Sequence, residues 1–144
     1  NYYSLNVNDN SSTYFDAGAN GAAMRNLPIA LVKAGNEKEL IVDSFLNSII
    51  THGHSRAILA SILFGLAVKY VLLNEKDAQR SLSNYLLDSL DGLYEKVCDE
   101  GRINTWIHWR NKFSKNGRLT FENEFKTTVE ESLVFLRDVP KYMK

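Results

Sequence analysis

Residues 57–73, AILASILFGLAVKYVLL, decide the fold of this chain. They are almost wholly apolar, with interruptions at Ser61, Gly65 and Lys69. A helix that is apolar on every side is either a membrane span or the centre of a helical domain. The stretch is at the lower edge of the length that spans a bilayer, and it contains a lysine. We therefore expect a buried central helix.

The chain before this stretch has a helical pattern with clear boundaries. Apolar residues recur at three- and four-residue spacing, and Pro28 suits the first turn of a helix that begins near Asn26. Gly35 and Asn36 form a typical C-terminal stop. A second helix is expected from Glu37 to Ile50, because its first turn carries the acidic residues that the helix dipole favours.

The chain after the central stretch predicts an amphipathic helix and an aromatic loop. The helix is expected from Ala78 to Cys98, with Gly101 as its stop. The segment from Ile103 to Lys115 is interpreted as irregular. Its Trp106 and Trp109 rings favour a loop pinned to the core. Exposed and clustered rings there would instead indicate an interaction surface.

A last helix is expected to begin at Thr120 or Glu122 and to end at Pro140. No strand-type alternation persists along the sequence. We therefore predict an all-α chain of five helices in one domain, residues 1–144, that is loop-rich over residues 1–20 and helical over residues 22–144. Candidate apolar anchors in the loop-rich start are Tyr2, Tyr3, Leu5, Val7, Tyr14 and Phe15.

Charge and cysteine content narrow the function classes. Lys plus Arg is 17 and Asp plus Glu is 17, so the net charge is zero. Nucleic-acid binders usually carry a basic excess, and a neutral chain gains little from an anionic membrane surface, so neither partner is expected. Cys98 is the one cysteine, which rules out an intrachain disulfide and indicates a reducing compartment, the cytoplasm.

The first candidate site is Gly-Ala-Asn-Gly-Ala-Ala-Met-Arg, residues 18–25, which leads into a helix. Glycines let the backbone approach a ligand closely, and the free N–H groups of such a turn attract phosphate. Asn20 adds a side-chain donor and acceptor. Considered by itself, a turn of this kind is more often only a turn. It matches neither a Walker loop nor a dinucleotide fingerprint.

The second candidate site is Thr-His-Gly-His, residues 51–54, just before the central stretch. His52 and His54 do not share a helix face. They make a poor zinc site, because no third or fourth ligand is visible. A lone histidine at a helix N-terminus is more often a polar surface or packing residue.

Together the two segments resemble the ADP-ribosylglycohydrolase family, the enzymes similar to dinitrogenase reductase-activating glycohydrolase. That family carries a Gly-x-Asn-Gly-x-x-Met-Arg loop, an early proline in the following helix, a downstream Thr-His and a long Ala-rich buried helix. The matching elements here are residues 18–25, Pro28, Thr51-His52 and residues 57–73. The resemblance is firm from Gly18 to Leu73, and beyond it only helical character matches.

The resemblance implies a compact, multi-helix orthogonal bundle, incomplete in this chain, around a two-metal centre that usually holds Mg²⁺. It implies a hydrolase that removes ADP-ribose from modified protein side chains or related small molecules. Met24 and Arg25 would lock the loop onto the core, and the arginine would need a buried carboxylate or carbonyl partner. His52 would line the ligand cleft, and the loop that cradles diphosphate and ribose would comprise Ala17, Gly18, Ala19, Asn20, Gly21 and Ala22.

The chain departs from the family in its metal-binding motifs. The family binds its metals through Thr-Asp-Asp-Thr near its N-terminus and Asp-x-Asp-Thr near its C-terminus, and neither occurs here. No two Asp residues are adjacent, and Asp88 and Asp91 do not fit. Since Mg²⁺ needs clustered oxygen ligands, its ligands are expected outside this chain, and the catalytic residues stay unassigned.

Three interpretations follow. The chain is the central segment of a longer enzyme, whose partners are ADP-ribose or an ADP-ribosylated substrate and the remainder of the same protein. Alternatively, it is a degenerate relative that binds without hydrolysing, or a purely structural or partner-binding helical domain. The start at Asn1, and an end close to the expected position of the second metal motif, favour the central segment.

Overall fold

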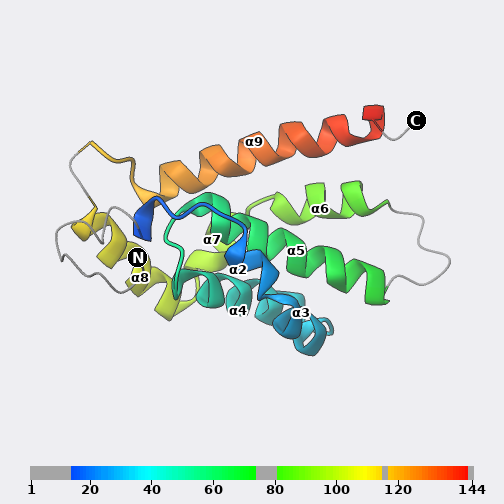
Figure 1. The fold of residues 1–144 in the computed structure, drawn as a ribbon, viewed down its shortest axis with the longest axis horizontal. Helices are drawn as coiled ribbons and strands as arrows, with labels where there is room; N and C mark the ends of the chain where they lie inside the picture. The colour runs from blue at the N-terminus through cyan, green and yellow to red at the C-terminus, as the bar shows by residue number, and fades with distance from the viewer. Residues whose placement is uncertain (1–13, 74–80, 115–116, 143–144) are drawn as a thin grey trace.

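The computed structural model describes residues 14–73, 81–114 and 117–142, and these ranges are built from helices, with no strand among them (Figure 1). The predicted all-α fold is confirmed, although eight helices occupy these ranges rather than five. The helices are α2 (Gly21–Met24), α3 (Leu27–Lys33), α4 (Glu37–Ile49), α5 (Ser55–Leu73), α6 (Leu82–Leu90), α7 (Leu93–Cys98), α8 (Gly101–Phe113) and α9 (Phe121–Tyr142).

Helix α5 lies at the centre of the bundle, with α2, α3 and α4 on one side and α6 and α9 on the other (Figure 1). Ile58, Ile62 and Leu66 are fully buried along it, and each side chain of this size contributes about 1.5–3 kcal/mol when removed from water. The expected buried central helix is confirmed for this part. Its last turn differs, since Val71 is 69% exposed.

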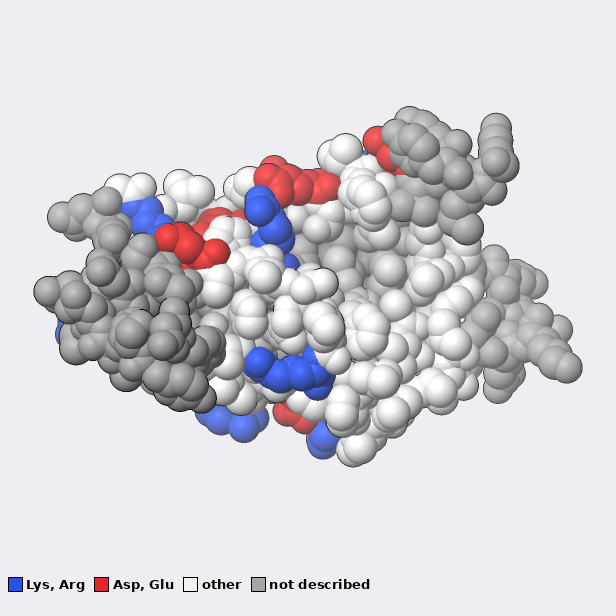
Figure 2. Space-filling view, viewed as in Figure 1, with Lys and Arg blue, Asp and Glu red and all other residues white. Residues whose placement is uncertain are grey.

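Helix α5 is also long and apolar enough to cross a membrane, a test that the core helix of a soluble protein passes equally well. Outside the core, α3 and α5 expose large apolar side chains, among them Leu31, Val32 and Phe64. Figure 2 shows a broad uncharged area on this face, with Lys, Arg, Asp and Glu scattered around it rather than gathered by sign.

A buried polar contact joins the start of α3 to α4 and α5. The Asn26 side chain is fully buried, and its amide donates to Ser44 Oγ (2.8 Å) and to the Ser61 carbonyl (3.0 Å). Gly65 of α5 lies against this contact, where an added Cβ would come within 3.2 Å of the Asn26 amide. Because the amide is hydrogen-bonded, its burial is tolerated and it sets the spacing of three helices.

The predicted boundaries of α3 and α4 are confirmed. Pro28 lies in the first turn of α3, where its missing N–H costs nothing. Asn36 caps α4 by accepting a hydrogen bond from the Glu39 N–H (3.1 Å). These local signals are short-range, which explains why the sequence alone located them.

The prediction of a single helix from Ala78 to Cys98 is wrong. Residues 74–80 lie outside the described ranges, and the rest is divided into α6 and α7. Ser81 caps α6 by accepting from the Asn84 N–H (3.2 Å). Gly92 separates the two helices with a φ of 62°, a left-handed conformation that glycine adopts without steric cost.

The irregular loop predicted after Gly101 is also wrong, because Gly101–Phe113 forms α8. Glu100 caps this helix by accepting from the Ile103 N–H (3.0 Å). Trp106 is pinned to the core as expected, with ring contacts to Phe45 and Phe121. By contrast, Trp109 is 44% exposed and clusters with exposed Phe113, so the interaction-surface alternative stays open there.

Helix α9 begins after Thr120, whose hydroxyl accepts from the Asn123 N–H (3.4 Å). Of the two predicted starts, Thr120 is therefore confirmed. Phe121 and Phe125 of α9 are fully buried against the core. Pro140 does not end the helix, which continues to Tyr142. A proline in the last turn removes one backbone hydrogen bond and leaves the rest of the helix intact.

Candidate active site

Residues 14–20 are held beside the connection between α4 and α5. The Gly53 N–H donates to the Tyr14 carbonyl (2.9 Å), and the Tyr14 hydroxyl donates to the Ile49 carbonyl. Phe15 is 1% exposed. Tyr14 and Phe15 are thus confirmed as anchors, whereas the other proposed anchors, Tyr2, Tyr3, Leu5 and Val7, lie outside the described residues.

Gly53 makes this close approach sterically allowed. A Cβ at this position would lie 2.5 Å from the Tyr14 ring and 3.1 Å from the Phe15 ring. Any larger residue would therefore push the N-terminal segment away. In the sequence this glycine stands out only as part of a break between helices.

The predicted loop and His52 lie on the same side of the molecule and contact each other. A Cβ on Gly21 would lie 3.3 Å from His52 Cε1 and 3.5 Å from His52 Nε2. A Cβ on Gly18 would lie 3.6 Å from the His54 ring. The two segments singled out in the sequence are thus brought together, and their binding of a ligand stays a prediction.

The predicted binding residues differ in solvent access. The Asn20 side chain is exposed and makes no capping bond to α2, while its carbonyl accepts from the Met24 N–H (3.0 Å). Ala22 is fully buried, so its side chain packs into the protein interior rather than facing a ligand. Ala19 is exposed, and the half-buried members are Ala17, Gly18, Gly21 and His52.

Arg25 ties α2 to the C-terminal end of α4. Its Nε donates to Asn47 Oδ1 (3.2 Å), its Nη1 to Thr51 Oγ1 (2.6 Å) and its Nη2 to the Asn47 carbonyl. The predicted lock is therefore made through neutral oxygens, including a carbonyl. Met24 is 72% exposed, so the prediction that it also locks the loop is wrong: the single turn of α2 directs it to solvent.

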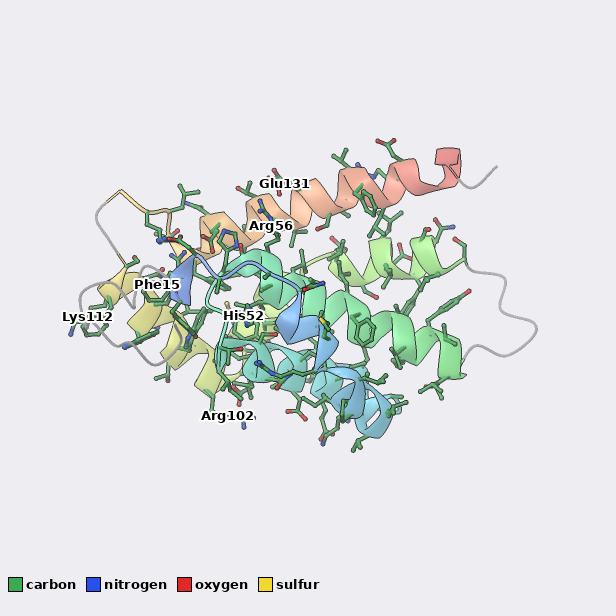
Figure 3. All side chains as sticks on the ribbon, in the orientation of Figure 1. Phe15, His52, Arg56, Arg102, Lys112 and Glu131 are labelled. Atoms are coloured by element: carbon green, nitrogen blue, oxygen red, sulfur yellow. The ribbon has the colours of Figure 1, made fainter. Side chains whose placement is uncertain are left out.

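His52, labelled in Figure 3, is hydrogen-bonded to Thr51, which also accepts from Arg25. Its Nδ1 is 2.7 Å from Thr51 Oγ1. Burial, and then the positive charge of Arg25, lower the pKa of His52 below its usual value. Both effects favour the neutral ring, whose contact with Thr51 is a hydrogen bond and not an ion pair.

A charged cluster is centred on Glu124 of α9, and His54 is the one member of it that belongs to a site predicted from the sequence. Glu124 Oε1 lies 3.1 Å from Arg110 Nη2, and 3.7 Å from both Arg118 Nη1 and His54 Nε2. Glu124 Oε2 accepts from the Ser55 N–H (3.2 Å) at the start of α5. One carboxylate thus joins α5, α8, α9 and the connection that carries His54.

Arg110 is the buried member of this cluster, with 0% exposure. Its Nη1 donates to the Leu119 carbonyl (2.6 Å), and burial lowers the pKa of its guanidinium while Glu124 opposes that effect. A sequence signal existed, because Arg110 follows Ile103 and Ile107 at helical spacing on one apolar face. This spacing goes unrecognised when residues 103–115 are interpreted as irregular rather than helical.

The cluster reaches the predicted loop through Arg118. Its guanidinium pairs with Asp16 and donates to the Phe15 carbonyl (3.4 Å). The Gly18 backbone lies against His54, which faces Glu124. The segment before α2 is therefore supported from the α8–α9 side as well as from α4.

The described residues do not fit the metal pair that the resemblance implies. Among them, no group of three or more His, Cys, Asp and Glu side chains is placed to hold a metal ion. Mg²⁺ requires several oxygen ligands, and the Glu124 carboxylate is surrounded by guanidinium groups. The Glu124 cluster is therefore a structural ion-pair network and not the metal centre of the family.

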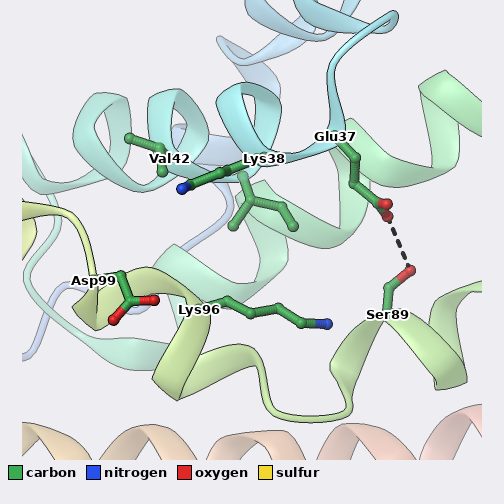
Figure 4. A pocket seen from close by; sticks show the side chains of 7 residues that line it. Glu37, Lys38, Val42, Ser89, Lys96 and Asp99 are labelled. Atoms are coloured by element: carbon green, nitrogen blue, oxygen red, sulfur yellow. Dashed lines mark hydrogen bonds between the residues drawn. The ribbon is translucent and has the colours of Figure 1, made fainter.

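Two cavities lie away from the predicted loop. One of about 330 Å³ lies between α4, α6 and α7 (Figure 4), where Glu37 accepts from the Ser89 hydroxyl (3.4 Å). The other, of about 360 Å³, lies between α6, α7 and α9. Neither is lined by residues 17–22 or His52. Neither of these two cavities is therefore the ligand cleft that the sequence predicted.

Comparisons with known proteins address the family directly. No curated protein and no solved structure matches this chain. The family model for ADP-ribosylglycohydrolase matches residues 4–135 of the 144. This match extends well past Leu73, where the resemblance noted in the sequence became faint, and includes α8 and most of α9. The chain belongs to the ADP-ribosylglycohydrolase family.

Proposed function

We propose that this chain is part of a hydrolase that cleaves the glycosidic bond of ADP-ribose conjugates, either ADP-ribosylated protein or a related small molecule. In this proposal the chain supplies the phosphate-binding turn, residues 17–22, and part of the pocket wall at His52. Membership in a hydrolase family supports the reaction class.

The observation that carries the proposal is the contact between Gly21 and His52. A Cβ at residue 21 would lie 3.3 Å from the imidazole, so the ring packs directly against the backbone of the turn. A glycine-rich turn offers backbone N–H groups to an anion, and an imidazole offers a directed hydrogen bond beside it. A sugar diphosphate has phosphate oxygens that can accept from the backbone N–H groups, and a further phosphate or hydroxyl oxygen that can accept from the imidazole.

The residues of this chain would bind and orient rather than perform the bond cleavage. The turn would hold the diphosphate, and the exposed Asn20 side chain would hydrogen-bond a phosphate or ribose oxygen. The Mg²⁺ expected of the family orients ribose hydroxyls and activates water when it is bound. Its ligands would come from the remainder of the same protein.

Calorimetry with ADP-ribose on the intact protein, in the presence of Mg²⁺, tests the binding role. Asn20→Ala should weaken ADP-ribose binding about tenfold, since it removes one hydrogen bond to a charged or polar ligand. Asn123→Ala, at an exposed position of α9, is the matched control and should leave binding unchanged. Absence of binding by the wild-type protein would remove the proposal.

A second candidate function is ADP-ribose binding without turnover. The observation that favours it is the absence of adjacent Asp residues from the sequence, together with the absence of a metal-type cluster among the described residues. Release of ADP-ribose from an ADP-ribosylated protein distinguishes the two. Binding without release, with Mg²⁺ present, would establish the second candidate.

We also propose a cytoplasmic location. Cys98, at the end of α7, is the one cysteine of the chain, and burial raises the pKa of its thiol. A lone cysteine without a disulfide partner in the chain is compatible with a reducing compartment. Cell fractionation that recovers the protein with a secreted or membrane fraction would contradict this part.

A further inference from the structure

A chain of hydrogen bonds connects Arg25 to the ring of His52. Arg25 Nη1 is 2.6 Å from Thr51 Oγ1, and Thr51 Oγ1 is 2.7 Å from His52 Nδ1. The guanidinium is anchored at its other end, because Nε and Nη2 donate to the side chain and the carbonyl of Asn47. The position of the Thr51 hydroxyl is therefore set from both sides.

The chemistry of the three groups determines which of them donates and which accepts in each of these hydrogen bonds. A guanidinium donates only, so Thr51 Oγ1 accepts from Arg25. The hydroxyl has one proton of its own to donate, and His52 Nδ1 is the acceptor within reach. If Nδ1 carried the ring proton, the Thr51 proton would need another acceptor, and the described residues provide none. Among the described residues, the arrangement that gives every one of these protons a protein acceptor leaves Nδ1 unprotonated.

The other ring nitrogen faces the predicted loop. His52 Nε2 lies 3.5 Å from the position of a Cβ on Gly21. No hydrogen bond to Nε2 is found within the part of the chain that the structure describes. A neutral imidazole that accepts at Nδ1 carries its proton at Nε2, on the ring edge that faces Gly21, and no described residue accepts that proton.

We propose that Arg25 and Thr51 are positioning residues that hold His52 as the neutral tautomer with its proton on Nε2, so that this N–H donates to an oxygen of the bound sugar diphosphate. The inference rests on the proposed function, because it names the ligand that the turn would hold. It gives His52 the role of a neutral hydrogen-bond donor to the ligand, and not that of a cation or a general base.

Independent support comes from electrostatics. Burial and the Arg25 charge both lower the pKa of His52, so the protonated ring is disfavoured beside the guanidinium. The same guanidinium therefore fixes the acceptor side of the ring and discourages a second proton. Substitution of Thr51 separates the hydrogen bond to Nδ1 from the effect of the Arg25 charge. It removes the hydroxyl that connects Arg25 to the ring and leaves the guanidinium in place.

The test uses four variants of the intact protein. Thr51→Val removes the hydroxyl at nearly constant volume, and Thr51→Ser retains it. Thr105→Val is the matched control, because the Thr105 hydroxyl bonds the Gly101 carbonyl on an exposed face of α8. Ring ¹⁵N chemical shifts, assigned with His52→Gln, report the protonation of each nitrogen of His52, and ADP-ribose calorimetry reports affinity.

In the wild-type protein, Nδ1 should have the shift of a hydrogen-bonded acceptor and Nε2 that of a protonated nitrogen. Thr51→Val should shift Nδ1, increase the population protonated at Nδ1, and weaken ADP-ribose binding about tenfold. Thr51→Ser should restore both readouts, and Thr105→Val should change neither. A structural role alone would not move the ¹⁵N shifts of one ring and be rescued by serine.

Two failures remain distinguishable. If the wild-type protein carries its proton at Nδ1, or if Thr51→Val alters neither the ring shifts nor the affinity, the inference is wrong while the proposed function stands. If the ring shifts behave as expected but the wild-type protein does not bind ADP-ribose, the assignment of the tautomer survives and both the proposed function and the donor role fall.

Discussion

Two arginine networks support the predicted loop, and they differ in how far they are removed from water. Arg25 is exposed and bonds neutral oxygens of α4 and Thr51. Arg110 is fully buried and faces the carboxylate of Glu124. An exposed guanidinium keeps its hydration, so neutral partners suffice, whereas a buried one needs a countercharge. The first network contacts the His52 ring through Thr51, and the second joins α8 and α9 to the start of α5.

The largest expected effect comes from breaking the buried network. Glu124→Ala should lower the free energy of unfolding by about 3–5 kcal/mol, because it leaves Arg110 buried without its carboxylate. Chemical denaturation monitored by far-UV circular dichroism measures the change. Glu131→Ala, on an exposed part of α9 (Figure 3), is the control and should stay within about 0.5 kcal/mol. A loss below about 1 kcal/mol for Glu124→Ala would show that the two networks do not differ as described.

An intermediate effect is expected at Gly53, between the two networks. Gly53→Ala should destabilise the protein by about 1–3 kcal/mol, since its Cβ would lie 2.5 Å from the Tyr14 ring and force the N-terminal segment outward. It should also weaken ADP-ribose binding, because that segment leads into the turn. Gly101→Ala has open space around the added Cβ and serves as the control. Equal thermal stability of the two variants would contradict the close packing at Gly53.

The smallest effect is expected in the exposed network. Because the pKa of His52 is lowered in the folded protein, the unfolded chain binds more protons below about pH 6.5. His52 therefore contributes stability above that pH, and the contribution is lost as the pH falls toward the folded pKa. Arg25→Gln should make this dependence shallower, because burial then acts alone, and should cost about 1 kcal/mol in lost hydrogen bonds at pH 7.

Urea unfolding between about pH 5 and pH 7.5 measures this dependence. His52→Gln is the reference, since it removes the titrating ring and should show none of this contribution. A steeper dependence in Arg25→Gln than in the wild-type protein would contradict the assignment of Arg25 as a group that disfavours the protonated ring.

The parts that the sequence predicted correctly are those with local signals. Each of these signals depends only on residues that are close in the sequence. They are the stop at Gly35 and Asn36, the proline in the first turn of α3, the Thr120 cap and the apolar run of α5. The interpretations that were wrong depended on distant contacts. Gly101 resembles a helix stop in sequence, yet it opens α8, because Glu100 caps that helix and Ile103 and Ile107 bury one face.

The sequence by itself determined the all-α class, the buried centre and the two segments of the candidate site, since periodicity and residue order carry that information. Only the tertiary structure decided that Gly21 meets His52, that Thr51 connects Arg25 to the ring, and that Glu124 pairs with buried Arg110. These contacts join positions far apart in the chain. Their energies depend on burial and geometry, which exist only once the helices have packed.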